Sequence, residues 1–360
     1  MSTSDVSIVS NSPEEENLTE EFKNLANVIC SVIKNTTDDF TVGIFGDWGT
    51  GKTTLMKLIQ KEISTDKERE LQNKDLDVLK LFNESNASKF KNFFQKKDLL
   101  EKDKEKAFTT VWFSPWRFEN EISHATMPLL VLIIKELLIQ ISNRQDYLSK
   151  NGKKIYSFLK SCEYQLQISA PGISFTATKD KEDTQKNING IPIPTLQQGI
   201  DIIKNMLKEI NSDKKKFNLK IILFIDDLDR CSPEITVEVL DSIKILLNIK
   251  GVVNVVGLND NVVAKLLSEK LDKYEINPDQ YLQKIIDLSI RIPDWNQEQI
   301  KKIVENSIKK IKSDPLGSFI SQKSQWFSVV SENNPRQIKR LINEFIIDYE
   351  FYRISQEEKP

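Results

Sequence analysis

The chain has 360 residues, of which 39% are hydrophobic and 29% are charged, a composition that excludes wholesale disorder and suits one large domain with an appendage, or two domains. Lys and Arg number 51 against 53 Asp and Glu, so the net charge of −2 gives no indication of nucleic-acid binding. Three separated cysteines and a single histidine, His124, exclude a disulfide framework, a thiolate zinc site and a histidine-cluster metal site.

The N-terminal residues 1–16 are polar and then acidic, so they predict a disordered tail and no secretory signal. The most apolar stretch, residues 127–141, contains Lys135 and Glu136 and is shorter than the ~20 residues that span a bilayer. We therefore expect no transmembrane segment and a cytoplasmic protein.

Helices and strands alternate along most of the chain. Apolar residues at helical spacing predict a helix over 20–33, and β-branched runs predict strands. The strands are expected at residues 40–45, 108–113, 219–225, 252–258 and 285–292. Because these runs are almost continuously apolar and helices separate them, the fold class is α/β, with a mostly parallel sheet sandwiched by helices.

Two stretches interrupt the alternation and are interpreted as charged or helical insertions, at about 61–107 and 124–215. Beyond residue 294 only helical patterns remain, which predicts a C-terminal helical lid. The expected domains are therefore a tail over 1–16, a nucleotide domain over 17–294 and a lid over 295–360.

A complete GxxxxGK[ST] motif follows the first predicted strand and precedes a helical run. The motif and the threonine after it are Gly46, Asp47, Trp48, Gly49, Thr50, Gly51, Lys52, Thr53 and Thr54. Glycines allow backbone N–H groups to surround a phosphate, and the helix start adds its positive dipole. We expect all these residues to bind the nucleotide, with Lys52 on the outer phosphates and the Thr53 hydroxyl on Mg²⁺.

An apolar strand also delivers the acidic residues Asp226 and Asp227 at its end. In that position Asp226 is expected to bind the magnesium, and Asp227 to orient and polarise the attacking water as a catalytic residue. The alternative, an acidic surface turn, is disfavoured by the unbroken apolar run before it. Arg230 either pairs with Asp227 or Asp229, or reaches a nucleotide in a neighbouring subunit.

Asn259 follows the next strand and is expected to hydrogen-bond the attacking water or the γ-phosphate, the alternative being a turn or helix cap. A GTPase would show a DxxG element after the magnesium strand and an NKxD element that reads the base. The segments that begin at Asp226 and Asn259 match neither pattern. ATP is therefore the expected nucleotide.

A further cation is expected at the nucleotide from the C-terminal helices. Asn334 and Pro335 form a helix start, which places Arg336 in the first turn. Arg336 is expected to contact the γ-phosphate, and it shares a cationic helix edge with Lys339, Arg340 and Asn343. The alternative is an ordinary solvated amphipathic helix.

Four segments together resemble the KAP family of P-loop NTPases. These are GDWGTGKTT, WFSPWRFE at 112–119, FIDDLDRCSPE and NPRQIKRLIN, which occur in that family's order between residues 43 and 345. The resemblance implies a P-loop fold related to AAA+ and STAND ATPases, with Asp226 and Asp227 as the acidic pair. Bacterial KAP proteins are associated with phage exclusion and membrane-linked signalling, although this chain lacks the transmembrane helices that many of them carry.

Together these patterns predict a Mg²⁺-dependent ATPase that acts as a nucleotide-controlled switch in bacterial anti-phage defence or signalling. Its expected partners are further copies of the chain, an effector protein, or both. Three alternatives stay open: a nucleotide-gated scaffold with little hydrolysis, a small-molecule kinase, and a DNA-acting ATPase. No role follows from the sequence for the 112–119 element: packing stays open for Trp116, and a position facing the nucleotide stays open for Arg117 or Glu119.

Overall fold

The computed structural model describes most of the predicted nucleotide domain and its C-terminal extension. The described residues are 8–10, 19–36, 39–64, 108–118, 133–134, 158, 196–212, 220–246, 249–271, 277–309 and 314–357. His124, Glu119, most of the predicted insertion at 61–107 and almost all of the segment 124–195 lie outside them.

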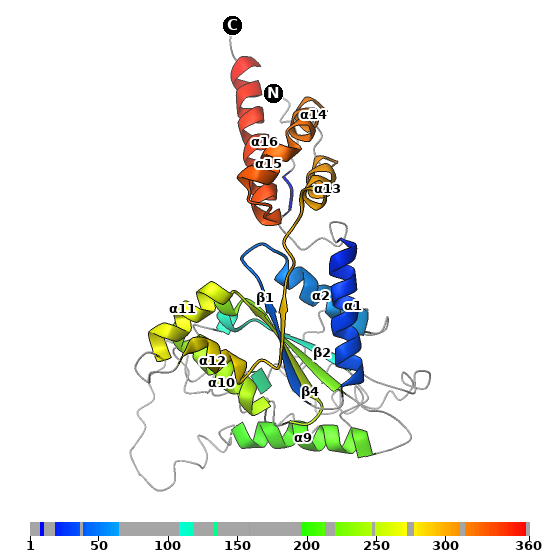
Figure 1. Cartoon of the computed structure of the whole chain (residues 1–360), viewed down its shortest axis with the longest axis vertical. Helices are drawn as coiled ribbons and strands as arrows, with labels where there is room; N and C mark the ends of the chain where they lie inside the picture. Colours follow the sequence, from blue (N-terminus) through cyan, green and yellow to red (C-terminus); the bar gives the residue numbers. More distant parts are fainter. Residues whose placement is uncertain are drawn as a thin grey trace, which may run out of the picture. The chain divides into compact units, whose positions relative to one another are not determined.

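Five strands form one parallel sheet, as the alternating pattern predicts, in the order β2-β3-β4-β1-β5 (Figure 1). They are β1 (Phe40–Phe45), β2 (Phe108–Phe113), β3 (Lys220–Ile225), β4 (Val252–Leu258) and β5 (Leu288–Arg291). The last strand is shorter than the predicted 285–292. Its expected first residues belong to a turn, because the N–H groups of Ile285 and Ile286 both donate to the carbonyl of Leu282.

The central strands are covered on both faces. Every residue of β3 and of β4 is buried, although successive side chains of a strand point to opposite faces. Their sequences are apolar except at Lys220 and Asn254, which reflects this two-sided burial. The strands β2 and β3 are in register up to their last residues, since Phe113 pairs with Ile225. The segments after these two strands therefore leave the sheet at the same level.

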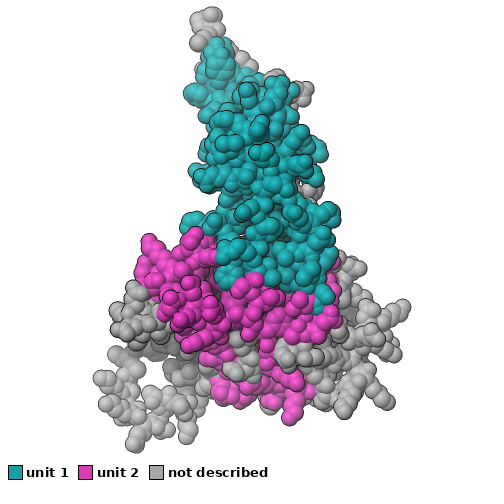
Figure 2. Space-filling model, viewed as in Figure 1, with its two compact units in different colours: residues 1–31, 44–59, 290–360 teal, residues 32–43, 60–289 magenta. Residues whose placement is uncertain are grey.

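The chain divides into two compact units, one formed by residues 1–31, 44–59 and 290–360 and the other by 32–43 and 60–289 (Figure 2). Among the residues that the structure describes, the second unit contains β2, β3 and β4 together with four α-helices. They are α9 (Leu196–Ser212), α10 (Pro233–Leu246), α11 (Asp260–Leu271) and α12 (Pro278–Gln283). Two short 3-10 helices, η2 (Pro115–Phe118) and η4 (Leu228–Arg230), follow β2 and β3.

A polar cluster joins α12 to α10 within the second unit. The Tyr281 hydroxyl donates to Asp241 Oδ1 at 2.8 Å, and Lys244 Nζ lies 2.9 Å from that oxygen and 4.0 Å from the centre of the tyrosine ring. Burial, followed by the hydrogen bond and charge of Asp241, raises the pKa of Tyr281 above its usual value. The cluster therefore ties the two helices together through a neutral phenol.

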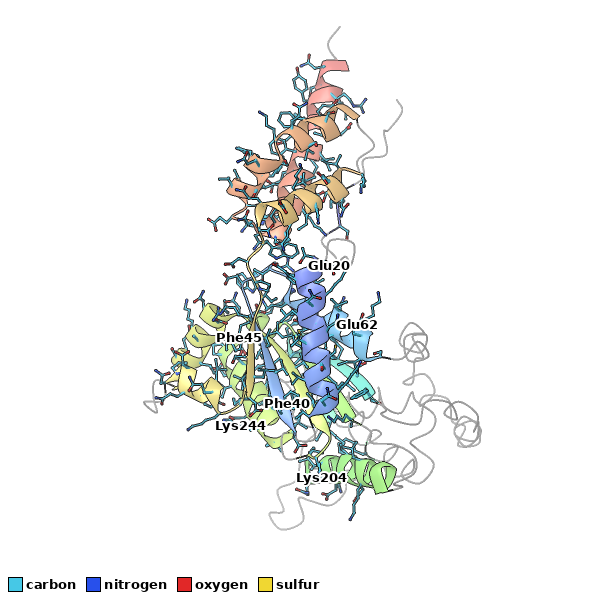
Figure 3. The ribbon with its side chains drawn as sticks, turned by 45° about the vertical axis from the view of Figure 1, so that its right-hand side comes forward. Glu20, Phe40, Phe45, Glu62, Lys204 and Lys244 are labelled. Carbon is cyan, nitrogen blue, oxygen red and sulfur yellow. The ribbon has the colours of Figure 1, made fainter. Side chains whose placement is uncertain are left out.

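The first unit contains the helices on either side of the glycine-rich loop and the C-terminal helices. They are α1 (Glu20–Asn35), α2 (Lys52–Ile63), α13 (Gln297–Ile308), α14 (Asp314–Gln322), α15 (Ser324–Val330) and α16 (Pro335–Glu357). The α1 and α2 helices are adjacent, since Cys30 Sγ donates to the Ile59 carbonyl at 3.7 Å. The glycine-rich loop joins β1, which runs from Phe40 to Phe45, to α2, which has Glu62 in its last turn (Figure 3).

The C-terminal helices pack through an aromatic cluster, which agrees with the helical pattern predicted beyond residue 294. Phe345 of α16 lies between 5.3 and 6.0 Å, centre to centre, from the rings of Phe319, Trp326 and Phe327. Among the described helices, none combines the length and the apolar character that a membrane span requires.

Residues 8–10 lie against the edge of α16 that the sequence predicts to be cationic. Val9 is buried, donates its N–H to Asn343 Oδ1 at 2.7 Å and accepts from Asn343 Nδ2 at 2.9 Å. Lys339 Nζ donates to the Ser10 carbonyl at 3.1 Å. The amide of Asn343 supplies both a donor and an acceptor, so it holds the segment as a neighbouring strand would. Lys339 and Asn343 thus bind backbone of the same chain, while Arg340 stays exposed.

Candidate functional site

The loop between β1 and α2 has the backbone conformation that a phosphate-binding loop requires. Gly49 and Gly51 have φ of +82° and +112°, values that other residues rarely adopt. A Cβ atom at Gly49 would also lie 2.5 Å from Asn334 Oδ1 and 2.7 Å from the Arg336 Cβ. Both the conformation and the close approach of α16 therefore require glycine at position 49.

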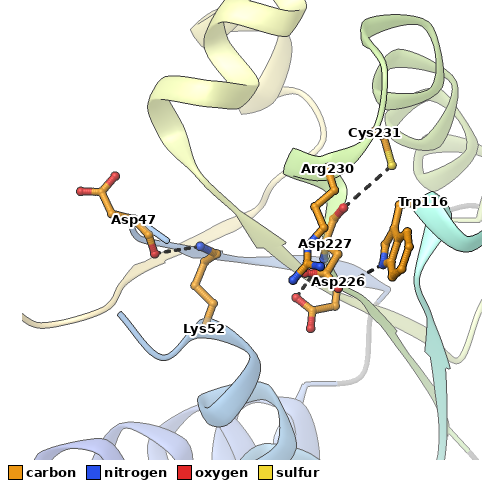
Figure 4. Close-up of polar contacts among 7 residues, drawn as sticks. All are labelled: Asp47, Lys52, Trp116, Asp226, Asp227, Arg230 and Cys231. Carbon is orange, nitrogen blue, oxygen red and sulfur yellow. Dashed lines mark hydrogen bonds and ion pairs between the residues drawn. The ribbon is translucent and has the colours of Figure 1, made fainter. Parts of the chain in front are cut away.

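Donors hold the carbonyl groups of this loop. Lys52 Nζ donates to the Gly46 carbonyl at 2.8 Å. It also donates to the Asp47 carbonyl at 3.0 Å (Figure 4). The Thr50 carbonyl accepts from Trp295 Nε1 at 2.8 Å. Backbone N–H groups can converge on an anion only where the carbonyls of the same loop point elsewhere. These bonds fix that orientation, so the loop is organised to bind phosphate.

The start of α16 lies directly against the loop. Asn334 Nδ2 donates to the Trp48 carbonyl at 2.7 Å, and its Oδ1 accepts from the N–H groups of Arg336 and Gln337. The sequence predicts the helix start at Asn334 but not this second contact. Arg336 is exposed and its Cβ is close to Gly49, so the structure brings the arginine to the phosphate loop.

The acidic residues lie at the C-terminal end of β3, in the second compact unit. Asp226 is buried, and its Oδ1 accepts the backbone N–H of Asp227 at 3.0 Å. Asp227 has φ 60° and ψ 30°, a left-handed conformation that is uncommon outside glycine but more accessible to Asp than to most residues. The two neighbouring carboxylates differ in exposure, since Asp226 is buried and Asp227 is half-buried.

Two side chains hold the Asp227 carboxylate (Figure 4). Arg230 Nε lies 2.9 Å from Oδ1, and Trp116 Nε1 donates to Oδ2 at 3.2 Å. Of the two possibilities left by the sequence for Arg230, the structure shows the pairing with Asp227 in the same chain. Trp116 was missed as a site residue, because nothing in its local sequence identifies the distant carboxylate that its indole meets.

Asn259 lies buried after β4, the strand next to β1 in the sheet order. Its Oδ1 accepts the backbone N–H of Val262 at 3.2 Å, which is the helix-cap arrangement at the start of α11. Asn259 therefore lies at the expected strand end, and its side-chain oxygen caps helix α11.

The described residues offer oxygen donors of the kind that magnesium takes in nucleotide sites. In the part of the chain that the structure describes, no group of three or more His, Cys, Asp or Glu side chains could hold a metal ion. Mg²⁺ in nucleotide sites needs only one or two protein oxygens, because substrate phosphates and water complete its coordination. The buried Asp226 carboxylate and the hydroxyl of Thr53, in the first turn of α2, are oxygens of this kind.

Comparison with known proteins identifies the family. The family model described as "KAP family P-loop domain" matches residues 19–352. Because that match covers most of the chain, the chain belongs to the KAP family of P-loop NTPases, as the motifs indicate. A comparison with curated proteins gives no match.

Several solved structures share a distant likeness. The Aeropyrum pernix ORC2 protein in its ADPNP–ADP complexes is 12% identical with a TM-score of 0.39, over 89% of this chain and 59% of that one. The Aeropyrum pernix ORC1 protein in complex with DNA is 12% identical with a TM-score of 0.42, over 96% and 62%. A variant of Thermotoga maritima RuvB is 11% identical with a TM-score of 0.32, over 91% and 60%. The chain spans about three fifths of the length of these structures.

Proposed function

We propose that this KAP family P-loop NTPase binds ATP with Mg²⁺, hydrolyses the γ-phosphate by in-line attack of water, and uses the cycle as a molecular switch. The observation that carries the proposal is the phosphate loop, whose carbonyls are held by Lys52 and Trp295 and whose glycines adopt positive φ. Such a loop leads directly into a helix N-terminus, which attracts anions, and its GxxxxGK[ST] sequence is typical of loops that bind nucleotide phosphates.

Lys52 supplies the first cation. Its ammonium group lies on two neutral carbonyl oxygens, of Gly46 and Asp47. Anionic phosphate oxygens are stronger acceptors, because charge-assisted hydrogen bonds are about twice as strong as neutral ones. ATP is therefore expected to draw Lys52 from these carbonyls onto the outer phosphates, with Arg336 approaching the γ-phosphate from α16.

Asp226 and Asp227 have different proposed roles. Asp226 and Thr53 would hold the Mg²⁺, which when bound neutralises charge on the phosphate oxygens. Asp227 orients the attacking water and polarises it. The phosphate loop and the acidic pair are assigned to one nucleotide on chemical grounds, because in-line hydrolysis requires both a phosphate clamp and a water-positioning carboxylate. Asn259 is proposed to assist through its amide group, as its oxygen caps α11.

ATP is preferred to GTP on the sequence alone, since no DxxG or NKxD element occurs at the corresponding positions. The family resemblance supports a setting in bacterial anti-phage defence or signalling, with a second copy of the chain or an effector protein as partner. Phage challenge of cells that carry the wild-type chain or Lys52→Ala tests this setting separately from the chemistry.

Phosphate release by the purified chain, with ATP or GTP and with or without Mg²⁺, tests the activity. The diagnostic variant is Asp227→Asn, which keeps the size of the side chain and loses the carboxylate. It is expected to bind ATP as the wild type does and to lose hydrolysis by a factor on the order of 10². Asp201→Asn on the exposed face of α9 is the matched control and should hydrolyse normally.

The alternative is a nucleotide-gated scaffold with little hydrolysis. One observation favours it: Arg230 and Trp116 each take an acceptor position of the Asp227 carboxylate, which leaves fewer positions for the attacking water. The two functions differ in one measurement. A wild-type chain that changes its oligomeric state or partner with ATP, yet releases no phosphate, would be a scaffold.

A further inference from the structure

The contact between Trp116 and Asp227 follows from the register of two neighbouring strands. Because β2 and β3 end at the same level, with Phe113 opposite Ile225, the 3-10 helices after them are neighbours. The pairing continues one residue further, since the Asp226 N–H donates to the Phe113 carbonyl at 3.1 Å. Trp116 in one of these segments and Asp227 in the other are thereby fixed at hydrogen-bonding distance.

Each oxygen of the Asp227 carboxylate is held by a different donor. Trp116 Nε1 is 3.2 Å from Oδ2, and Arg230 Nε is 2.9 Å from Oδ1. The guanidinium of Arg230 also lies 5.6 Å from the centre of the Trp116 ring, so the three side chains form a closed triangle. A carboxylate offers about four acceptor positions, and these two donors leave others for a water molecule.

Burial does not explain this arrangement. Trp116 is 39% exposed, so water could satisfy its indole N–H without help from Asp227. The left-handed backbone of Asp227 also costs free energy, and such conformations persist mainly where the surroundings hold them for function. The contact is therefore better explained as a constraint on the position of the Asp227 carboxylate than as a means of satisfying the Trp116 N–H group.

We propose that Trp116 is a positioning residue for Asp227, whose carboxylate it holds at the angle needed to orient the attacking water. Arg230 holds the second oxygen and completes the constraint. This inference rests on the proposed function, since it gives Trp116 a role only if Asp227 acts on water. It assigns a role to the WFSPWRFE element, for which the sequence predicts none.

The test is Trp116→Phe, which keeps an aromatic ring beside Arg230 and removes the N–H donor. We expect kcat for ATP to fall about ten-fold, the effect of one lost hydrogen bond to a charged group, while KM stays within about two-fold. Trp112→Phe is the matched control, because the Trp112 ring stacks on Phe224 at 5.3 Å and this contact survives. Its kcat should equal that of the wild type.

A double variant distinguishes positioning from a general structural effect. In the Asp227→Asn background the second change, Trp116→Phe, should lower kcat no further. If it lowers kcat by the same factor in both backgrounds, or if Trp116→Phe alone hydrolyses as the wild type does, the inference is wrong while the proposed function stands. A wild-type chain without turnover overturns the proposed function and this inference together.

A second variant covers the case in which Trp116→Phe fails to fold, which urea unfolding would reveal. Asp227→Glu keeps the charge but moves the carboxylate by one methylene group. If the position of the carboxylate matters, kcat of Asp227→Glu should fall although the carboxylate is retained, and its affinity for ATP should be unchanged. Wild-type kcat in Asp227→Glu would show that the angle of the carboxylate is immaterial.

Discussion

Asn334 and Trp48 connect the start of helix α16 to the phosphate loop through a single hydrogen bond of 2.7 Å. The same amide group caps the helix, because its Oδ1 accepts from the N–H groups of Arg336 and Gln337 while its Nδ2 donates to the loop. One side chain thus joins the phosphate loop to the first turn of α16, in which Arg336 lies.

The first prediction separates the two functions of Asn334. Asn334→Asp keeps the capping oxygen and loses the donor to Trp48, so nucleotide affinity should fall about 2- to 10-fold while the free energy of unfolding stays near that of the wild type. Asn334→Ala loses both functions and should also lower the free energy of unfolding by about 1 kcal/mol. Titration calorimetry and urea unfolding measure the two quantities. Equal affinities for all three proteins would show that the contact with Trp48 is incidental.

The second prediction concerns Lys52. Lys52→Ala should abolish measurable ATP turnover and weaken nucleotide binding, because it removes the ammonium group that is proposed to contact the outer phosphates. Lys57→Ala, an exposed lysine later in α2, is the control for loss of a positive charge from the same helix. Phosphate release and nucleotide titration provide the measurements. Turnover by Lys52→Ala at the wild-type rate would remove the site assignment.

The third prediction tests Arg336 against Arg340, which stand one turn apart on α16. If Arg336 contacts the γ-phosphate, Arg336→Ala should weaken ATP binding about ten-fold or more and leave ADP binding nearly unchanged. Arg340→Ala should change neither, since that side chain is 76% exposed and pairs with Glu344 at 3.6 Å. Equal losses of ATP and ADP affinity in Arg336→Ala would limit its role to folding or to contacts shared by both nucleotides.

The fourth prediction concerns stability at high pH. Burial and the Asp241 carboxylate raise the pKa of Tyr281 above its usual 10.0, so the unfolded chain loses this proton at lower pH than the folded chain. The resulting stabilisation is complete below pH 10 and is lost as the pH rises through the folded pKa. Tyr281→Phe should lack this decline and, at neutral pH, should be less stable by about 1 kcal/mol because one hydrogen bond is lost. Urea unfolding of both proteins at several pH values checks the difference, and parallel declines would contradict it.

The sequence by itself determined the elements whose signals are local. A complete phosphate-loop motif between a strand and a helix predicts the backbone conformation of the loop, because the glycines and the helix start are close together in the sequence. The continuous apolar strand before Asp226 likewise predicts burial on both faces, and both strand and burial are confirmed. The helices beyond residue 294 follow from apolar spacing in the same way.

The tertiary structure decided which distant side chains meet. Trp116 and Asp227 are 111 positions apart, and their contact depends on the register of β2 against β3. The contact of Asn334 with Trp48 spans 286 positions, and the capping motif predicts only the local half of it. Val9 is held by Asn343, although the two residues are 334 positions apart. Each of these contacts joins segments brought together by packing of the whole domain, so no local periodicity or motif carries a signal for it.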